Sequence, residues 1–380
     1  MATAQRRGRR GNQEGSIWQS GKSWVAQIRL GGRRVGKRFG TRAEAQTWLL
    51  EQRQGWRDAR QSSSRQLIRD YAEDWLSRQA TSAKRRGTGT RSPRTVAEYG
   101  KKLRSYVVPQ LGAMGLAEVT PPMVAEMLDY WRGRGVGART MRHTHTILKA
   151  LFGDAVRRQE IQFNPAAAVD PPGIPEAEAY RAVALSLEQW AVVVKMGIGS
   201  ASPALVLAAA MGLRRSEVCG LTWDHVHLDK AVPALEVAQG LHRITGKGLT
   251  LLPPKNRMSE RILPLPALVT EVLRSAPHRS DFVCTTSGGR PLDPETFSRS
   301  IWPVRDLVHE PELRLHHLRH TIVTLVQART SVPFGLQQAY WGHAQIGTTL
   351  GKYFHPGGED LGQVSRAIDN LYAASSPGSR

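Results

Sequence analysis

The first forty residues alternate apolar and polar side chains in short runs. In "GSIWQSGKSWVAQIRLGGRRVGKRFGT" the apolar positions recur at every second residue from Trp24 to Leu30, and "SGK" and "GGR" interrupt the runs. Alternation of this kind predicts half-buried strands, and the glycine-containing breaks predict tight turns. Thr41 and Glu44 then form the Thr-x-x-Glu pattern of a helix N-terminus. We therefore expect a three-stranded sheet backed by one helix.

From about residue 65 to residue 170, apolar residues recur with the spacing of amphipathic helices. Four such segments follow one another, "LIRDYAEDWLSRQ", "TVAEYGKKLRSYVVPQLG", "PPMVAEMLDYWRGRG" and "TMRHTHTILKALFGDAVRRQ". The polar run "QSSSRQ" before them and the Pro- and Ala-rich run from Asn164 indicate linkers. Residues 81–94 predict a basic loop between the first two helices. Short polar connections favour a compact helical bundle.

These patterns predict a multidomain chain that is mainly α-helical with small β-sheets. A chain of 380 residues is too long for one compact core, which agrees with that division. We expect a basic tail and sheet domain in residues 1–60, a helical domain in 65–170, a mixed α+β domain in 182–372 and a short tail in 373–380.

The amino-acid composition indicates what kind of partner the chain binds. Lys and Arg outnumber Asp and Glu by 53 to 32, a surplus of +21, and residues 1–60 alone hold 14 against 4. Such an excess points to nucleic acid, because neutralising phosphates releases counterions. A membrane partner is disfavoured, since no long cationic amphipathic helix stands out and the most apolar stretch, from Ala204, is too short to span a bilayer. Two distant cysteines and the lack of a signal-peptide core predict a cytosolic protein.

The sheet domain holds the first candidates for contact with a nucleic acid. Four basic residues fall on its third predicted strand, namely Arg33, Arg34, Lys37 and Arg38. A basic sheet of this size could enter the major groove of DNA and read base edges. The alternative is a sheet that touches only backbone phosphates.

The stretch "LRLHHLRHTIVTL" gathers basic side chains on one side of a predicted helix. At about 100° per residue, His316, Arg319 and His320 share one face, while Leu318 and Ile322 lie opposite. A zinc site, a phosphate clamp and an ordinary solvated face are the three interpretations. A zinc helix of the His-Glu-x-x-His type needs a Glu between its histidines, and here an arginine would repel the cation. Arginine forks and imidazoles instead suit a phosphate.

Further motifs in residues 182–372 supply matching chemistry. "MGLRRSEVCGLTW" places Arg214 just after an apolar helix, with Glu217 one turn later and able to brace it. "LPPKNRMSERILPLP" predicts Lys255 at the tip of a hairpin closed by "RILPL". "YWGHAQIGTTLGKYFHPG" supplies His343, with Tyr353 ten residues later. Taken singly, each residue is more often structural, but together they form a cationic set with one tyrosine at hand.

These motifs resemble those of the tyrosine recombinase (phage integrase) family. The family pattern is an Arg in a Gly-Leu-Arg-x-x-Glu turn, a hairpin Lys, His-x-Leu-Arg-His-Thr, and Leu-Gly-His followed by Thr-Thr and a nucleophilic Tyr. The resemblance assigns catalytic roles to Arg214, Lys255, His316, Arg319, His343 and Tyr353. It also extends over nearly the whole chain, with residues 1–60 similar to an arm-type DNA-binding domain and 65–170 similar to a core-binding domain.

The resemblance implies a reaction and a set of partners. Tyr353 would attack the scissile phosphodiester and form a 3′-phosphotyrosyl link, while Lys255 protonates the departing 5′-oxygen. No metal and no other cofactor is expected. The implied enzyme integrates a phage or plasmid-type mobile element, and also excises it, in the cytoplasm of a bacterial host cell. It would act as a homotetramer on core crossover sites and arm sites of double-stranded DNA, with an accessory DNA-bending or directionality factor.

Two other functions share part of this pattern. A type IB topoisomerase-like enzyme uses the same phosphotyrosyl chemistry, but the separate basic arm domain disfavours it. A non-catalytic DNA-binding regulator would need no complete set of six residues.

Trp341 departs from the family, which usually has Leu there. A narrow apolar stripe at Leu361, Val364, Ile368 and Leu371 predicts a last helix, which either folds onto its own domain or, as the resemblance implies, docks on a neighbouring subunit.

Overall fold

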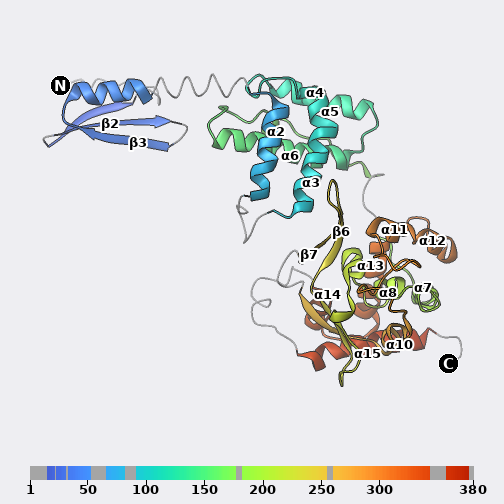
Figure 1. Ribbon diagram of the computed structural model, residues 1–380. Coiled ribbons are helices and arrows are strands. Elements are labelled where there is room, and N and C mark those ends of the chain that lie inside the picture. The colour runs from blue at the N-terminus through green and yellow to red at the C-terminus, as the bar shows by residue number, and fades with distance from the viewer. Residues whose placement is uncertain are drawn as a thin grey trace, which may run out of the picture. The chain divides into compact units, whose positions relative to one another are not determined.

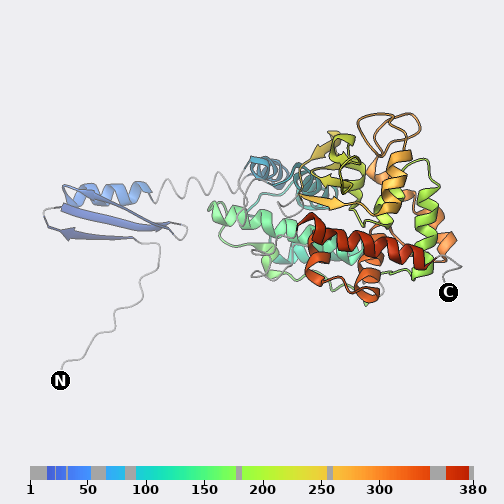
Figure 2. The same cartoon turned by 90° about the horizontal axis from the view of Figure 1, so that it is seen from below.

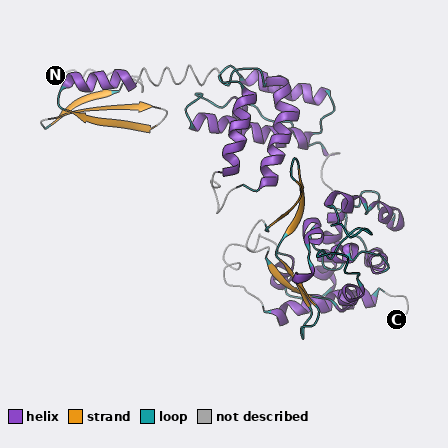
Figure 3. Cartoon of the chain, in the orientation of Figure 1, coloured by secondary structure: helices purple, strands orange, loops and turns teal. Residues whose placement is uncertain are grey.

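The computed structural model describes eight ranges of the chain. They are residues 15–21, 23–30, 33–52, 66–81, 91–176, 182–254, 260–342 and 357–375, without the side chains of residues 29, 30, 33 and 34. Contacts between residues divide the chain into two units, Met1–Ala179 and Tyr180–Arg380. Each compact part is described by itself below, and Figures 1 and 3 show its elements.

The predicted sheet and its helix are confirmed. Strands β1 (Ser16–Ser20), β2 (Ser23–Leu30) and β3 (Arg33–Phe39) pair antiparallel in the order β1-β2-β3, and a helix over 42–52 covers one face (Figure 3). The N-terminus of this helix is capped as expected, since the Glu44 amide donates to Thr41 Oγ1 at 3.2 Å and the Thr41 amide donates to Glu44 Oε2 at 3.1 Å. A small core of Ala26, Ile28 and two helix residues joins the layers.

The second part of the first unit is the predicted helical bundle. Its helices are α2 (Ile68–Thr81), α3 (Pro93–Lys102), α4 (Val108–Leu111), α5 (Pro121–Gly133) and α6 (Ala138–Arg157). A π-helical turn, Leu103–Val107, joins α3 to α4 just before Pro109, which has no N–H to donate to a regular turn. A 3₁₀ turn, Pro165–Ala168, follows α6 in the stretch that was predicted as a linker. The apolar faces of these helices share one continuous core.

The second unit is a mainly helical body with small sheets. Its helices are α7 (Leu187–Ile198), α8 (Ala204–Ala209), α9 (Arg215–Gly220), α10 (Ala267–Ser275), α11 (Pro294–Arg299), α12 (Trp302–Val308), α13 (Leu315–Arg329), α14 (Phe334–Trp341) and α15 (Gly358–Ala374). Every residue of α8 is buried, and this helix packs on α7 and α13. It therefore forms the centre of the unit.

The strand pairing in this unit differs from the predicted hairpin. Strands β4 (Val226–His227), β5 (Ala234–Val237) and β8 (Arg261–Pro264) form one sheet, and β6 (Gly240–Ile244) pairs with β7 (Gly248–Leu252) in another. The "RILP" strand therefore pairs with β5 rather than with the strand before Lys255. The expectation was wrong because neighbouring β-strands need not pair, and burial of Leu263 in the main core places β8 beside β5.

The last helix buries its apolar stripe within its own unit. Leu361, Val364, Ile368 and Leu371 all belong to the main core, and α15 contacts β8, α10, α13 and α14. Figure 2 shows α15, in red, running along this body. Within the single chain the stripe is therefore covered by its own unit, as the first of the two alternatives expects, while docking on a neighbouring subunit stays a prediction. Across the described ranges, no helix has both the length and the apolar character needed to cross a membrane.

Candidate active site

The turn that carries Arg214 is shaped by the glycine before it. Gly212 has a φ of +63°, and a Cβ there would meet Trp341 Nε1 at 2.9 Å and Ile322 Cγ2 at 3.0 Å. A residue with a side chain would therefore be both strained and obstructed. The turn ends the buried helix α8 and directs Arg214 to the N-cap position of α9. The apolar run and the glycine thus place this arginine at the edge of the core.

Glu217 braces Arg214 as expected, and it also binds a second arginine. Arg214 donates from its amide to Glu217 Oε2 at 2.9 Å and from Nη1 to Oε1 at 2.7 Å. Arg261 donates from Nη1 to Oε1 at 3.3 Å and from Nη2 to Oε2 at 3.1 Å. Burial by itself would raise the pKa of the Glu217 carboxyl, but Arg261 and Arg214 outweigh it and hold this pKa at about 2. Glu217 is therefore a carboxylate at every physiological pH.

Helix α13 brings Arg319 to the same place. Its apolar side is buried as predicted, with Leu318 and Ile322 in the main core. Arg319 lies on the polar side but is only 4% exposed. Its Nη1 donates to the Gly212 carbonyl at 2.8 Å, and its Nη2 donates to the Trp341 carbonyl. Burial and the nearby charge of Arg214 lower the pKa of Arg319 to about 9, so that it remains a cation at neutral pH.

His316 completes the described part of the cluster. Its ring lies 4.7 Å from that of His320, in an edge-on arrangement. Partial burial, His320 and Arg319 lower the pKa of His316 below its usual range. Its imidazole is therefore neutral at physiological pH and can accept a proton as well as donate one. His317, by contrast, is buried and turned back to the start of its own helix, where its Nδ1 accepts from the Arg314 amide at 3.1 Å.

The helix α14 ends inside this cluster. Its last carbonyls have no helical N–H partner, and three arginines bind them in turn. Arg261 Nε donates to the Tyr340 carbonyl at 2.9 Å, Arg319 donates to that of Trp341, and Arg214 Nη2 donates to that of Gly342 at 2.9 Å. The segment that contains His343 begins at the next residue. The cluster is thus assembled around the end of α14.

Trp341, the residue that departs from the family pattern, connects the end of α14 to the turn that carries Arg214. Its indole is fully buried, and Nε1 donates to the Met211 carbonyl at 3.0 Å. A leucine at this position would fill less of the core and could not make this bond. The tryptophan therefore joins the end of α14 to the turn that carries Arg214.

Trp341→Leu is expected to lower the free energy of unfolding by about 3 kcal/mol, because it leaves a cavity and an unpaired buried carbonyl. Urea denaturation of a fragment that spans residues 182–380 measures this change. Trp302→Leu on α12 is the matched control, since Trp302 is 55% exposed, and it should cost less than about 0.5 kcal/mol. Equal midpoints for the two variants would show that the Trp341 contact contributes nothing.

Several residues predicted from the sequence fall outside the described ranges. Lys255, His343 and Tyr353 are all in this group, so their catalytic roles stay predictions. The structure brings together Arg214, His316, Arg319 and the supporting Glu217. Arg33 and Arg34 lie on β3, opposite Leu30 and Arg29, and their side chains are not described. No group of three or more potential metal ligands gathers within the described part of the chain.

The register of the N-terminal sheet separates Lys37 from Arg38. Lys37 is opposite Ala26, which packs against the helix, so it lies on the helix-covered face. Its Nζ is 5.6 Å from the centre of the Phe39 ring. Arg38 is opposite Val25, and Val25 is opposite the exposed Trp18, so Arg38 lies on the uncovered face. Lys37 and Arg38 therefore do not belong to one surface, although a count of charges alone would suggest it.

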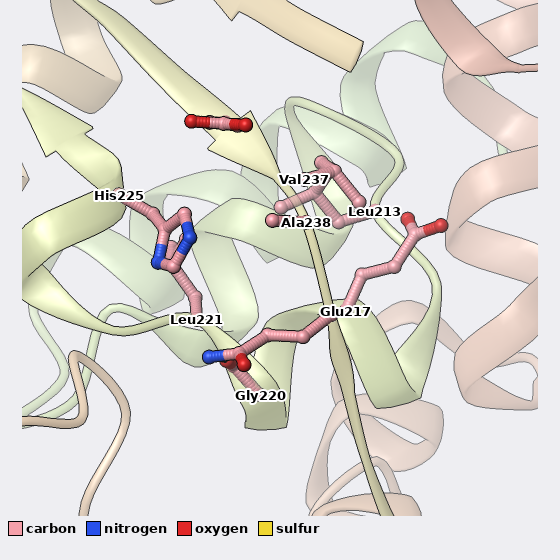
Figure 4. A pocket seen from close by; sticks show the side chains of 9 residues that line it. Leu213, Glu217, Gly220, Leu221, His225, Val237 and Ala238 are labelled. Carbon is pink, nitrogen blue, oxygen red and sulfur yellow. The ribbon is translucent and has the colours of Figure 1, made fainter. Parts of the chain in front are cut away.

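Sequence patterns did not single out Arg261, which the structure places at the centre of the cluster. Its side chain is 7% exposed and binds both Glu217 and α14. The one signal was an arginine at the start of a short apolar strand. A pocket beside this network is lined by Glu217 itself, together with Leu213, Leu221 and His225 among others. Figure 4 shows the Glu217 carboxylate pointing away from His225.

Comparisons with known proteins match both units. Residues 199–359 match the model of the phage integrase family, and residues 78–171 match that of the phage integrase central domain. An integrase of Streptomyces ambofaciens is 27% identical over 86% of this chain and 87% of its own length. A putative prophage phiRv2 integrase of Mycobacterium tuberculosis is 24% identical over 84% of each chain.

Solved structures share the fold at low sequence identity. The Tn1549 transposon integrase in complex with a circular intermediate DNA has a TM-score of 0.59 at 18% identity, covering 79% of this chain and 99% of its own. A lambda integrase dimer bound to a core site has a TM-score of 0.53 at 17% identity, covering 92% and 96%. A lambda integrase tetramer bound to a Holliday junction has a TM-score of 0.52 at 17% identity, covering 89% and 96%.

Proposed function

Because the chain belongs to the tyrosine recombinase (phage integrase) family and is a site-specific recombinase that breaks and rejoins DNA strands, we propose that it does so through a 3′-phosphotyrosyl intermediate on Tyr353. The tyrosine oxygen forms a bond to the scissile phosphorus, and the bond to the 5′-oxygen breaks. A second 5′-hydroxyl then reverses the step on a new strand. The covalent link conserves the energy of the phosphodiester, so the reaction needs no nucleotide cofactor.

One observation carries this proposal, namely the unbalanced charge of the cluster. Arg214 and Arg261 bind the Glu217 carboxylate and Arg319 lies near it, so the four groups together carry +2 at neutral pH. Besides burial, the nearby charge of Arg214 lowers the pKa of Arg319, because the two cations repel each other. A bound phosphate relieves this repulsion. The same charge stabilises the extra negative charge of a pentacoordinate transition state.

The guanidinium groups retain donors for such a phosphate. Each has five N–H groups, and in the described part of the chain Arg214 and Arg319 use two each. The neutral His316 can take the proton from the attacking hydroxyl, and Lys255 can give one to the departing oxygen. His343, which follows Gly342 at the end of α14, would supply a further donor to the phosphate.

Among the three tyrosines of the second unit that follow residue 199, where the match to the phage integrase family begins, Tyr353 is the best candidate nucleophile. The Tyr340 hydroxyl is buried and donates to the Pro264 carbonyl at 3.1 Å, and its burial raises its pKa. Tyr372 packs edge-on against Trp190 in the main core. Tyr353 alone stands in the family position after "GHAQIGTTLGK".

We extend the proposal to the partners of the enzyme. The similar solved structures are integrases bound to DNA, with a tetramer on a Holliday junction among them. By analogy, this chain would bind core crossover sites of double-stranded DNA through the domains 65–170 and 182–372 and act as a homotetramer. Residues 1–60 would bind separate arm sites. Integration and excision of a phage or plasmid-type element in a bacterial cytoplasm, with an accessory factor, fit this assembly.

Covalent trapping tests the proposed function. The protein is incubated with fragmented genomic DNA of its source, denatured, and freed of non-covalent DNA, and the retained fragments are sequenced. We expect one short recurring sequence whose cleaved strand ends at the protein. Recovery of no fragment above the background of a Tyr353→Phe control would overturn the phosphotyrosyl mechanism.

Deletion of residues 1–60 is expected to abolish binding to arm sites while binding to the core site survives. The deletion removes a charge of +10, so the slope of log affinity against log salt should become shallower by about 0.9 for each DNA phosphate that the shortened protein no longer neutralises. Titrations at several salt concentrations measure it. Within the intact chain, Arg38→Ala should weaken arm binding more than Lys37→Ala, because only Arg38 lies on the uncovered face of the sheet. Unchanged arm binding after the deletion would discredit the arm domain.

A further inference from the structure

The buried Arg261 has no part in the reaction proposed above, which uses Arg214 and Arg319 as phosphate ligands. It comes from β8, whereas Arg214 is the N-cap of α9 and Arg319 comes from α13. Its side chain is 7% exposed, and that of Glu217 is 9% exposed. Burying a charged pair destabilises the fold unless the geometry is good and the remaining donors are satisfied. A buried arginine of this kind therefore calls for a function or a close structural fit.

The geometry of Arg261 is that of a clamp with two ends. Two of its nitrogens donate to the two oxygens of Glu217, at 3.3 and 3.1 Å, and the third donates to the Tyr340 carbonyl at 2.9 Å. A planar fork fixes both direction and distance, which a lysine ammonium cannot do. The two bonds to Glu217 orient the carboxylate that also binds Arg214. The bond to the Tyr340 carbonyl holds the last turn of α14, which ends two residues before His343.

We propose that Arg261 is a positioning residue of the recombination site, which sets the place of Arg214 relative to the end of α14. The inference rests on the proposed function, because it assigns a role in that same site. Arg261 acts through its partners and does not touch the phosphate. By sharing the Glu217 carboxylate it also prevents that group from neutralising Arg214 fully, so Arg214 keeps its charge for the substrate.

Three measurements distinguish this role from a merely structural one: DNA binding, the rate of adduct formation, and the pH dependence of that rate. The probe is a nicked core-site duplex that traps the covalent adduct. Arg261→Met should still bind the duplex within about threefold of the wild type, but form the adduct about 100-fold more slowly, as expected when reacting groups are misplaced by about 1 Å. Thermal melting of each variant reports folding separately. Arg305→Met is the matched control, since Arg305 also donates from Nε to a carbonyl, that of Leu313, outside the cluster.

The pH dependence of the cleavage rate is the third measurement. Glu217 faces Arg214, Arg261 and Arg319, and His225 and Glu236 line the pocket beside it. Without Arg261, the cost of burial is opposed chiefly by Arg214, so the pKa of Glu217 should rise from its depressed value. Protonation then releases Arg214, so the rate of Arg261→Met should fall as the pH is lowered over a range where the wild-type rate changes less. Arg261→Lys should regain much of the wild-type pH profile, because it restores the charge, but stay slow, because it lacks the fork.

The outcomes separate the inference from the proposed function. If the wild type forms no adduct, the proposed function fails before Arg261 is tested. If the wild type reacts and Arg261→Lys or a folded Arg261→Met reacts at the same rate, the positioning role is overturned. A loss of DNA binding that parallels the loss of rate would also overturn it and make Arg261 a structural residue. If Arg261→Met does not fold, the rate and pH profile of Arg261→Lys decide alone.

Discussion

Tyr353→Phe is expected to bind core-site DNA with unchanged affinity and to form no covalent adduct. The substitution removes one hydroxyl and leaves the basic domains and the Arg214–Arg319 pair intact, so only the nucleophile is lost. The measurement is a denaturing gel with a labelled, nicked core-site duplex, run beside a binding titration. The reduction should reach the detection limit, because the proposed mechanism uses this hydroxyl as its nucleophile.

Tyr340→Phe is the matched control for this result. Its hydroxyl is bonded to the Pro264 carbonyl in the core, so the change should lower the free energy of unfolding by about 1 kcal/mol and leave the adduct. A denaturation-resistant protein–DNA species from Tyr353→Phe would show that the nucleophile is misassigned.

Lys255→Ala is expected to slow cleavage of normal DNA by a factor on the order of 10² to 10⁴, the range of general acid catalysis. An alkoxide is a poor leaving group, and the proposed ammonium protonates it as it departs. A duplex whose bridging 5′-oxygen is replaced by sulfur needs no such proton, because a thiolate leaves unaided. The mutant should therefore recover most of its rate on the sulfur substrate in the same gel assay.

Arg214→Ala and Arg319→Ala provide the contrast for Lys255. Each removes charge from the transition state, at a cost on the order of 3 kcal/mol in the barrier, and sulfur substitution does not replace that charge. Neither variant should be rescued. If Lys255→Ala is not rescued either, the lysine binds phosphate or lies outside the reaction, and His316 becomes the next candidate for the acid.

Local patterns predicted the elements of this fold well and their pairing less well. Helical spacing and the Thr41–Glu44 pattern identified the helices and the cap, because these depend on residues three or four positions apart. The hairpin before "RILPL" was wrong because strand pairing depends on burial in a distant core, and β8 joins β5 across the intervening β6 and β7. The apolar stripe on α15 was predicted from the spacing of its residues. The surface on which it packs was not, because that depends on tertiary contacts with β8 and α14.

The site, too, could be predicted from the sequence only where its residues lie close together along the chain. The spacing within α13 was enough to place His316 and Arg319 on its polar side, and the three-residue step to Glu217 predicted the brace of Arg214. Arg261 could not be selected in this way, because Glu217 lies 44 positions and Tyr340 lies 79 positions from it. Trp341 stood out from the sequence only as a departure, since its partner Met211 is 130 positions away.

The central claim, cleavage through a link to Tyr353, is tested most directly by mass spectrometry of the trapped adduct. The adduct on a nicked core-site duplex is digested with nuclease and trypsin, and the peptide that retains a nucleotide is sequenced by fragmentation. The account predicts a mononucleotide on Tyr353, in the peptide of residues 353–366 that lies between the cleavage sites after Lys352 and Arg366. A nucleotide on any other residue, such as Tyr340 or Tyr372, would contradict it.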